Sequence, residues 1–314
     1  MIETKNLGKN FDDFQAVHDL NLMVAEGELL ALLGPNGAGK TTTVRMLGSI
    51  LKPTTGSAKI NGYDVVAQAD KVRRSIGMLT EQPGLYLRMS GLEYLLFYGR
   101  LYNMPDSEIE RRGLELFDRF NMSNTAHRRL GEYSKGMRQK VGLIRSMLHS
   151  PAVLLLDEPT SAMDPHSAKL VRDAIRELRD GKRSVILCTH NLAEAELLAD
   201  RIAIIKHGRI VADGKAVELK RQLLGQPQLE LCVDRPLNGQ LSEISSLVTV
   251  ESVQDNVIRY HTAHPHVTNP ILVRCLNDLG LGVITLQEVS QTLEEVYLRV
   301  VSDEDVIGNE QIVD

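Results

Sequence analysis

The chain has 314 residues, of which 43% are apolar and 25% charged, with a formal net charge of −5. The length predicts one large domain with a smaller one, and the composition is typical of soluble globular proteins. Because the net charge is negative, we expect no nucleic-acid partner. No signal peptide is visible, and the longest apolar runs, LLALL and VLLL, are too short to cross a bilayer. We therefore expect a cytoplasmic chain that reaches a membrane only through a partner.

A strand, a glycine-rich loop and a helix follow one another near the N-terminus. Residues 28–33, ELLALL, are almost continuously apolar, as in a strand buried on both faces. After the glycines, Val44, Leu47 and Leu51 recur at helical spacing. The runs VLLLD and SVILCT predict two more buried strands, with a helix over about 165–179 between them. This alternation predicts an α/β fold with a largely parallel sheet.

Residues 84–150 predict a helical subdomain within this α/β domain. Ser90 and Glu93 form a capping box before the helix LEYLLFYGRLY. Ser107 and Glu110 form another before IERRGLELFDRF. The insert ends in the glycine-bearing segment GEYSKGMRQK, after which helical periodicity resumes.

The pattern changes after residue 222, so we assign residues 1–222 to the first domain and 223–301 to a small α+β domain. Its segments LELCV, VTVESV and VIRYH alternate in polarity like exposed edge strands. Thr268, Asn269 and Pro270 predict a helix start, and Gly280 predicts its end. Residues 302–314 form an acidic tail without apolar periodicity, which we expect to be disordered.

The sequence GPNGAGKT at 34–41 is a phosphate-binding loop pattern. Its glycines let successive N–H groups point at phosphate oxygens, and the following helix presents its positive end to the same anion. Lys40 is expected to reach the β- and γ-phosphates and to act in catalysis, and Thr41 to bind Mg²⁺. The predicted nucleotide contacts here are Gly34, Pro35, Asn36, Gly37, Ala38, Gly39, Lys40, Thr41 and Thr42.

The run VLLLDE supplies a second chemical signal. Its strand delivers Asp157 to the carboxyl end of the sheet, where α/β proteins place their ligands. Asp157 is expected to hold Mg²⁺, and Glu158 to act as the general base toward the attacking water. Many nucleoside triphosphatases would fit these two motifs.

The segment YSKGMRQ at 133–139 narrows the class, because it resembles the signature sequence of the ABC ATPase family, usually written LSGGQ. Ser134 and Gly136 are in register, whereas Lys135 and Met137 replace a glycine and the glutamine. These departures are similar to those of the drug- and sodium-export branch. The resemblance covers about residues 1–220 and implies a phosphate-loop ABC cassette with a helical subdomain.

Further site residues are implied by this resemblance. Phe11 matches the aromatic residue that stacks on adenine, and Phe14 is a nearby competitor. Asp164, in SAMD, matches the loop that crosses the dimer interface. His190 matches the histidine that contacts the γ-phosphate and is assigned to catalysis.

The family places a glutamine that senses Mg²⁺ and the γ-phosphate near IGMLTEQP. Glu81 falls in that position, with Gln82 one residue later. A glutamate can ligate Mg²⁺, although its charge beside phosphates costs binding energy unless the ion offsets it. We favour Glu81 as the metal-binding residue and leave Gln82 open.

The resemblance implies an ATP- and Mg²⁺-dependent ATPase. The signature of one subunit completes the nucleotide site of the other, so a homodimer closes its sites on ATP. The resemblance further implies that a separate transmembrane permease docks near residues 81–86 and holds the chain on the inner face of the membrane. The segments YSKGM, EQPGLY and TLEEVYLRV are similar to those of daunorubicin-resistance, sodium-efflux and polysaccharide-export ATPases. Two alternatives remain: an ABC ATPase acting in translation or DNA repair, and a nucleotide-responsive module without hydrolysis.

Overall fold

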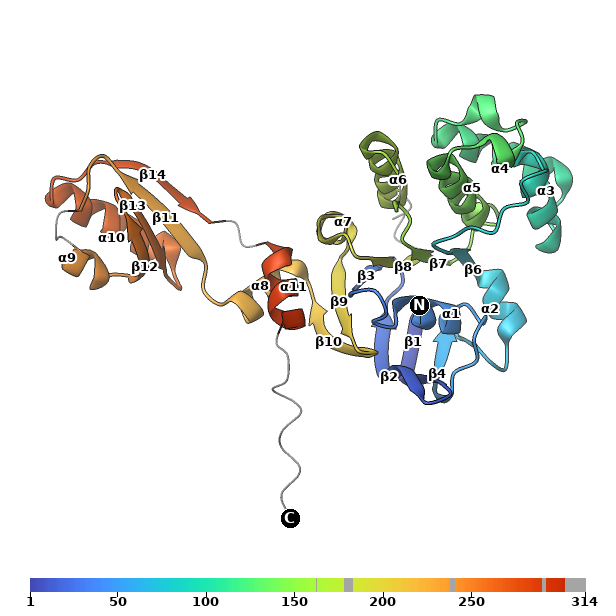
Figure 1. Cartoon of the computed structure of the whole chain (residues 1–314), viewed down its shortest axis with the longest axis horizontal. Helices are drawn as coiled ribbons and strands as arrows, with labels where there is room; N and C mark the ends of the chain where they lie inside the picture. Colours follow the sequence, from blue (N-terminus) through green and yellow to red (C-terminus); the bar gives the residue numbers. More distant parts are fainter. Residues whose placement is uncertain (162, 178–182, 238–240, 290–291, 303–314) are drawn as a thin grey trace, which may run out of the picture. The chain divides into compact units, whose positions relative to one another are not determined.

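The computed structural model describes residues 1–161, 163–177, 183–237, 241–289 and 292–302, which form two compact units (Figure 1). The units divide between Ala216 and Val217, whereas the sequence predicts a boundary after residue 222. No helix within these ranges is long and apolar enough to cross a membrane.

The first unit contains two sheets and several helices. Its strands are β1 (Ile2–Phe11), β2 (Phe14–Val24), β3 (Leu29–Leu33), β4 (Thr55–Ile60), β5 (Tyr63–Asp64), β6 (Ile76–Leu79), β7 (Val153–Asp157), β8 (Ser184–Thr189), β9 (Arg201–Lys206) and β10 (Arg209–Gly214). Its helices are α1 (Lys40–Leu47), α2 (Ala69–Ser75), α3 (Gly91–Leu101), α4 (Asp106–Arg119), α5 (Lys135–Met147), α6 (Pro165–Glu177) and α7 (Leu192–Leu198), with 3-10 turns at Ser123–Thr125 and Leu130–Glu132.

The main sheet has the strand order β10-β9-β3-β8-β7-β6, and its neighbours from β9 to β6 are parallel. The three predicted buried strands are β3, β7 and β8, and every residue in them is buried. Alternate side chains feed opposite faces of the sheet. Leu30 and Leu32 join a core with the second sheet, β2-β1-β4-β5, whereas Leu154 and Leu156 join a core with the helices. The prediction of a parallel α/β sheet is confirmed.

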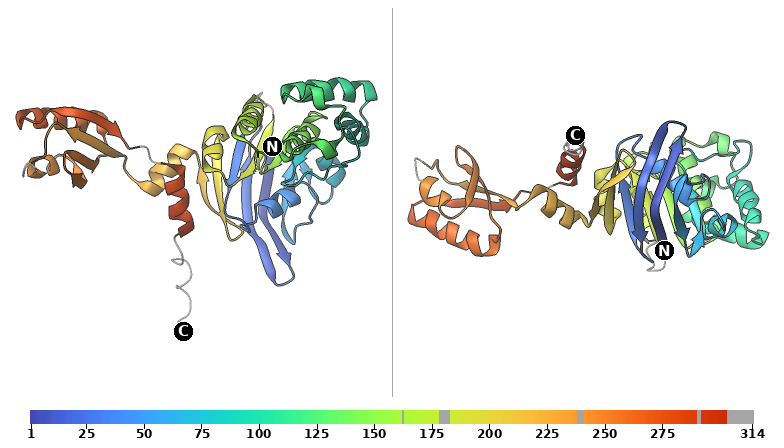
Figure 2. Two further views of the ribbon diagram at one scale, coloured as in Figure 1. Left: turned by 45° about the horizontal axis from the view of Figure 1, so that its top comes forward. Right: turned by 90° about the horizontal axis from the view of Figure 1, so that it is seen from below.

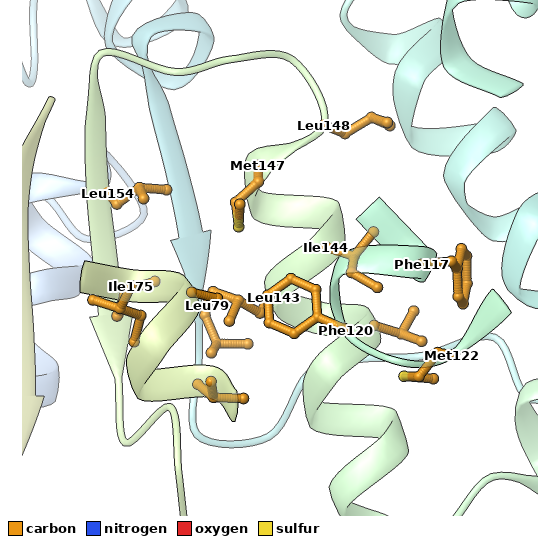
Figure 3. Close-up of a cluster of buried hydrophobic side chains, with 14 of the residues drawn as sticks. Leu79, Phe117, Phe120, Met122, Leu143, Ile144, Met147, Leu148, Leu154 and Ile175 are labelled. Carbon is orange, nitrogen blue, oxygen red and sulfur yellow. The ribbon is translucent and has the colours of Figure 1, made fainter. Parts of the chain in front are cut away.

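The helical subdomain is fastened to one face of this sheet by an apolar cluster. Figure 3 shows Leu79 of β6 beside Leu143 of α5, with Phe120 close by, and Leu154 of β7 belongs to the same cluster. Full burial of one such side chain stabilises the fold by about 1.5–3 kcal/mol. Two further views in Figure 2 show α3, α4 and α5 as one group beside the sheet. These contacts fix the position of α5.

Of the two predicted capping boxes, one is confirmed and one is wrong. Ser90 accepts from the backbone N–H of Glu93, whose carboxylate accepts from the N–H of Ser90. The second helix, α4, begins at Asp106 after Pro105 without a side-chain cap, so Ser107 lies inside its first turn. Proline pre-sets the extended backbone that precedes a helix, and the N-cap is therefore Pro105, two residues before Ser107.

The second unit contains α8 (Ala216–Leu224), β11 (Gln228–Val233), α9 (Leu241–Ser245), β12 (Thr249–Gln254), β13 (Val257–His261), α10 (Pro265–Asp278), β14 (Val283–Glu288) and α11 (Leu293–Ser302). From β11 to β14 the order is βαββαβ, with an antiparallel sheet in the order β12-β13-β11-β14. Leu231, Ile258 and Tyr260 share an apolar core with Leu272 and Leu276 of α10.

Several predictions for this unit need correction. The strands β11 and β13 are interior, since each pairs on both sides. Helix α10 starts at Pro265, and Pro270 lies within it, because Pro265 occupies the helix start. Gly280 follows with a φ of 73°, as a helix stop requires. Ser302 ends α11, and the rest of the predicted tail lies outside the described residues.

The chain enters and leaves this sheet at one place. Gln228 begins β11, and its carbonyl oxygen accepts a 2.9 Å hydrogen bond from the N–H of Val289, just after β14.

Candidate functional site

The loops after four neighbouring parallel strands meet at the carboxyl edge of the main sheet. The phosphate loop follows β3, Glu158 follows β7, His190 follows β8, and Glu81 follows β6 by two residues. They surround a cavity of about 460 Å³. Its lining consists of Phe11, Phe14, Ala16, Asn36, Gly37, Gly39, Lys40, Thr41, Thr42, Glu81, Asp157, Glu158, Ser161 and His190.

The shape of the phosphate loop depends on glycine. Gly39 has a φ of 106°, and a Cβ there would lie 2.7 Å from the carbonyl oxygen of Ala16. At Gly34 a Cβ would lie 2.3 Å from the carbonyl oxygen of Ile205. Any side chain at these positions would push the loop away from β2 and β9, so the loop can reach this shape only with glycine.

Two neighbouring residues at the start of α1 connect the loop to the rest of the site. The buried Lys40 donates from Nζ to the carbonyl oxygens of Gly34 at 2.6 Å and Pro35 at 3.0 Å. The Thr41 hydroxyl donates to Oδ2 of Asp157 at 2.9 Å, which joins the phosphate loop to the end of β7.

Asp157 is a buried carboxylate in an acidic neighbourhood. Burial is the main cause that raises its pKa, with further contributions from the charges of Glu158 and Glu81. The hydrogen bond from Thr41 and the charge of Lys40 oppose this rise. Carboxylates crowded in this way are stabilised by a cation.

Glu158 is held by its backbone and by its side chain. Its φ is 51°, in the left-handed region that glutamate rarely adopts. Its N–H donates to the carbonyl oxygen of Cys188 at 2.9 Å. Its Oε1 lies 2.8 Å from Nδ1 of His190, and the glutamate side chain is 13% exposed against 65% for the histidine. A half-sheltered carboxylate at the cavity wall can accept a proton from a bound water.

The sequence leaves two choices open, Phe11 or Phe14 for the adenine and Glu81 or Gln82 for the metal. Phe11 and Phe14 both line it, and they face each other across the β1–β2 turn. Of the neighbours Glu81 and Gln82, Glu81 is in the lining and Gln82 is not.

Other predicted residues lie outside this lining. Gly34, Pro35 and Ala38 shape the loop behind it. Ser134 caps α5, accepting from the N–H of Met137 at 3.2 Å, and Gly136 is in the first turn of that helix. Asp164 accepts from the N–H of Ser167 at the start of α6, and hydrogen bonds from Ser167 lower its pKa.

Sequence reasoning missed two cavity residues as site residues. Ser161 follows Glu158 by three residues and is the first residue of SAMD, the segment that resembles the dimer-interface loop, and this position is the signal that could have found it. Ala16 lies on β2 and reaches the cavity through the packing of β2 against the phosphate loop. Because this contact forms only when β2 packs against the phosphate loop, no local sequence pattern predicts it.

A phosphate loop between β3 and α1, with carboxylates at the end of a neighbouring parallel strand, defines a nucleotide-binding protein of the phosphate-loop class. The family model described as "ABC transporter" matches residues 17–161. The chain is 36% identical to a daunorubicin resistance ATP-binding protein of Streptomyces coeruleorubidus, over 94% of each chain. It is 41% identical to a daunorubicin/doxorubicin resistance ATP-binding protein of Streptomyces peucetius, over 94% of this chain and 86% of that one.

A third relative, the Nod factor export ATP-binding protein I of Rhizobium sp. (strain N33), is 33% identical over 96% of this chain and 97% of its own. Among solved structures, a dimeric post-hydrolysis ATP-binding cassette bound to ADP and Pi matches with a TM-score of 0.64 and 26% identity. That match covers 68% of this chain and 98% of the cassette. The chain belongs to the ABC transporter family, among its ATP-binding proteins.

Proposed function

We propose that this chain is the ATP-hydrolysing subunit of an exporter, that it dimerises on ATP, and that it drives a separate membrane permease. One observation carries the catalytic part of this proposal. The 2.9 Å hydrogen bond from Thr41 to Asp157 joins the phosphate loop to the strand end that also carries Glu158. A phosphate held by the loop would therefore lie beside a carboxylate that can activate water.

The binding roles follow from the positions of the side chains. Loop N–H groups and Lys40 would hold the phosphates, since the loop curls around the start of α1. Phe11, 42% exposed at the cavity wall, offers a ring face to the adenine.

The residues present fit Mg²⁺. Thr41 and Asp157 supply two adjacent oxygen ligands, and Glu81 lies on the same wall. No three acidic, histidine or cysteine side chains in the described ranges gather to hold a metal alone. Mg²⁺ favours such a site, because it takes one or two carboxylates and completes its shell with phosphate oxygens and waters. The ion would neutralise phosphate charge.

Glu158 is the proposed general base and would take a proton from the attacking water. The bond between its Oε1 and Nδ1 of His190 fixes the imidazole, which leaves the Nε2 of His190 to contact the γ-phosphate.

The dimer would complete each site. The chain has one phosphate loop and one signature, and neither Ser134 nor Gly136 is in the cavity lining. In a two-fold pair, the start of α5 would instead face the γ-phosphate bound by the other copy, with Asp164 nearby. The dimeric form of the similar cassette bound to ADP and Pi supports this arrangement.

The permease would dock on the helical subdomain. A groove of about 370 Å³ runs between the end of β6 and α3, and Met78, Gly84 and Tyr98 are among its lining residues. The name of the Nod factor export relative and the drug-resistance names of the others support export.

Phosphate release from Mg²⁺-ATP tests the enzyme. We expect wild-type turnover and a loss of at least about a hundredfold in Glu158→Gln, with nucleotide binding retained. Glu158→Gln is also expected to form a stable dimer in ATP by light scattering. Unchanged turnover in Glu158→Gln would reject Glu158 as the base. No turnover in the wild-type protein would favour a binding module without hydrolysis.

Capture from native membranes tests the partner. Tagged Glu158→Gln in ATP is expected to retain a multi-span membrane protein, whereas Lys40→Ala serves as the control with impaired phosphate binding. Recovery of ribosomes or DNA-repair proteins instead would favour the non-transport class.

A further inference from the structure

A carboxylate outside the cavity lining joins the loop that begins with Glu158 to the end of the strand that precedes His190. Glu194 lies in the first turn of α7, where its N–H donates to the capping side chain of Asn191 at 3.0 Å. Its side chain points inward, and the residue is 2% exposed.

Each oxygen of this carboxylate accepts a hydrogen bond from a threonine hydroxyl, one in the loop after β7 and the other at the end of β8. Thr160, two residues after Glu158, donates to Oε1 at 2.8 Å. Thr189, directly before His190, donates to Oε2 at 2.9 Å. The Thr189 oxygen also accepts from the N–H of Asn191 at 3.0 Å, so this hydroxyl is oriented toward the carboxylate.

Burying this carboxylate is unfavourable, and its surroundings compensate only in part. Burial is the main cause that raises the pKa of Glu194, and the charge of Glu158 adds to the effect. The two threonine hydroxyls and the charge of Arg172 act in the opposite direction. An apolar side chain would fill such a position at lower cost, so a buried charge here favours a role beyond packing.

The two hydrogen bonds to Glu194, from Thr160 and Thr189, form a bridge at the point where the pairing of β7 with β8 ends. The bond from the N–H of Glu158 to the carbonyl oxygen of Cys188 still belongs to the pairing of β7 with β8. After this bond the two segments are no longer paired through their backbones. The hydrogen bonds from Thr160 and Thr189 to Glu194 join them again through side chains. The distance between Oε1 of Glu158 and Nδ1 of His190 therefore depends on loops that this bridge ties together.

We propose that Glu194 is a positioning residue for ATP hydrolysis: through Thr160 and Thr189 it holds the Glu158–His190 pair in register. This inference rests on the proposed role of Glu158 as the base. Glu194 does not touch the cavity, so its loss should lower the rate of the chemical step and leave nucleotide binding in place.

Two single changes sever the bridge from opposite ends. Thr160→Val and Thr189→Val remove one hydroxyl each and keep the side-chain shape. Each is expected to lower kcat about tenfold, with the Kd of a non-hydrolysable ATP analogue within about twofold of wild type. The double variant should be no slower than the slower single, because both changes break the same link. Thr125→Val, in the helical subdomain, is the matched control and should keep wild-type kcat.

A combination with Glu158→Gln separates positioning from general destabilisation. If the bridge acts through Glu158, then Thr160→Val in that background should leave the residual rate unchanged. Glu194→Gln, which keeps the shape and replaces one acceptor oxygen with a donor, provides a second variant and should also lower kcat with binding held.

The outcomes distinguish this inference from the proposed function. Wild type without turnover would reject the function itself. Active wild type with unchanged kcat in the threonine and Glu194→Gln variants would overturn the positioning role alone. Parallel losses of kcat, nucleotide affinity and Tm would also overturn the positioning role, because they indicate a purely structural residue. The same conclusion would follow if Thr160→Val lowered the residual rate of Glu158→Gln further.

Discussion

The side-chain amide of Gln139 donates a hydrogen bond of 3.2 Å to the backbone carbonyl oxygen of Glu158. Gln139 is 5% exposed and lies on α5, the helix that Ser134 caps. The same carbonyl oxygen accepts from the N–H of Ser161 at 3.1 Å. Glu158 therefore keeps its positive φ with support from α5, and the signature helix and the proposed base of one chain are mechanically joined.

Gln139→Glu tests this link, because glutamate has a similar shape and no N–H to donate. Without the donor, the strained backbone of Glu158 relaxes, and a lost hydrogen bond of about 1–1.5 kcal/mol corresponds to a kcat about tenfold lower. Phosphate release measures the rate, and Gln287→Glu in the second unit is the control. Wild-type kcat in Gln139→Glu would contradict the link.

The choice between Phe11 and Phe14 is decided by ATP affinity. Phe11 is expected to stack on the adenine, and Lys9 lies 5.1 Å from the centre of its ring. Loss of a stacking contact worth about 1.4 kcal/mol raises Kd about tenfold in Phe11→Ala. Phe14→Ala, the matched control, should stay within about twofold. The reverse result would assign the contact to Phe14.

The Mg²⁺ dependence of turnover tests Glu81. If Glu81 binds the ion as proposed, Glu81→Ala removes a metal-binding oxygen at the cavity wall, so the Mg²⁺ concentration for half-maximal activity should rise about tenfold. Gln82→Ala is the neighbouring control and should behave as wild type. A shift in Gln82→Ala alone would move the assignment to Gln82.

His149 makes stability depend on pH. Its Nε2 donates to the carbonyl oxygen of Ile76 at 2.9 Å, its Nδ1 is buried, and its ring stacks on Tyr102 at 3.8 Å. Burial lowers its pKa to about 4 from a usual 6.5. Between pH 6.5 and 4 the unfolded chain binds a proton at His149 and the folded chain does not. The free energy of unfolding therefore falls as pH drops from about 6.5 toward 4.

The full effect is at most about 3.4 kcal/mol, since the pKa falls from 6.5 to about 4 and one pKa unit is about 1.36 kcal/mol. Urea unfolding of wild type at pH 7 and pH 5 should show the loss, and His149→Phe should lose less over the same range. Exposed His166→Gln is the control and should follow wild type. Equal pH dependence in His149→Phe would contradict this prediction.

The sequence predicts the main sheet and the phosphate loop because each depends on local signals: apolar runs buried on two faces, and glycines required at fixed positions. The Ser90–Glu93 box is local in the same way. Glu194 and Gln139 escape such reasoning, because their partners Thr160 and Glu158 come close only after β7, β8 and α5 have packed. The interior places of β11 and β13 are likewise decided by strand pairing, which alternating polarity does not reveal.

The bond between Val289 and Gln228 has a consequence for how this protein could have been assembled. A module whose entrance and exit are neighbours can be inserted into a loop, removed or exchanged without breaking the elements on either side. The βαββαβ module therefore has the chain geometry of an insertable part: joining the chain directly where it enters and leaves would remove the module and keep α8 and α11 on either side.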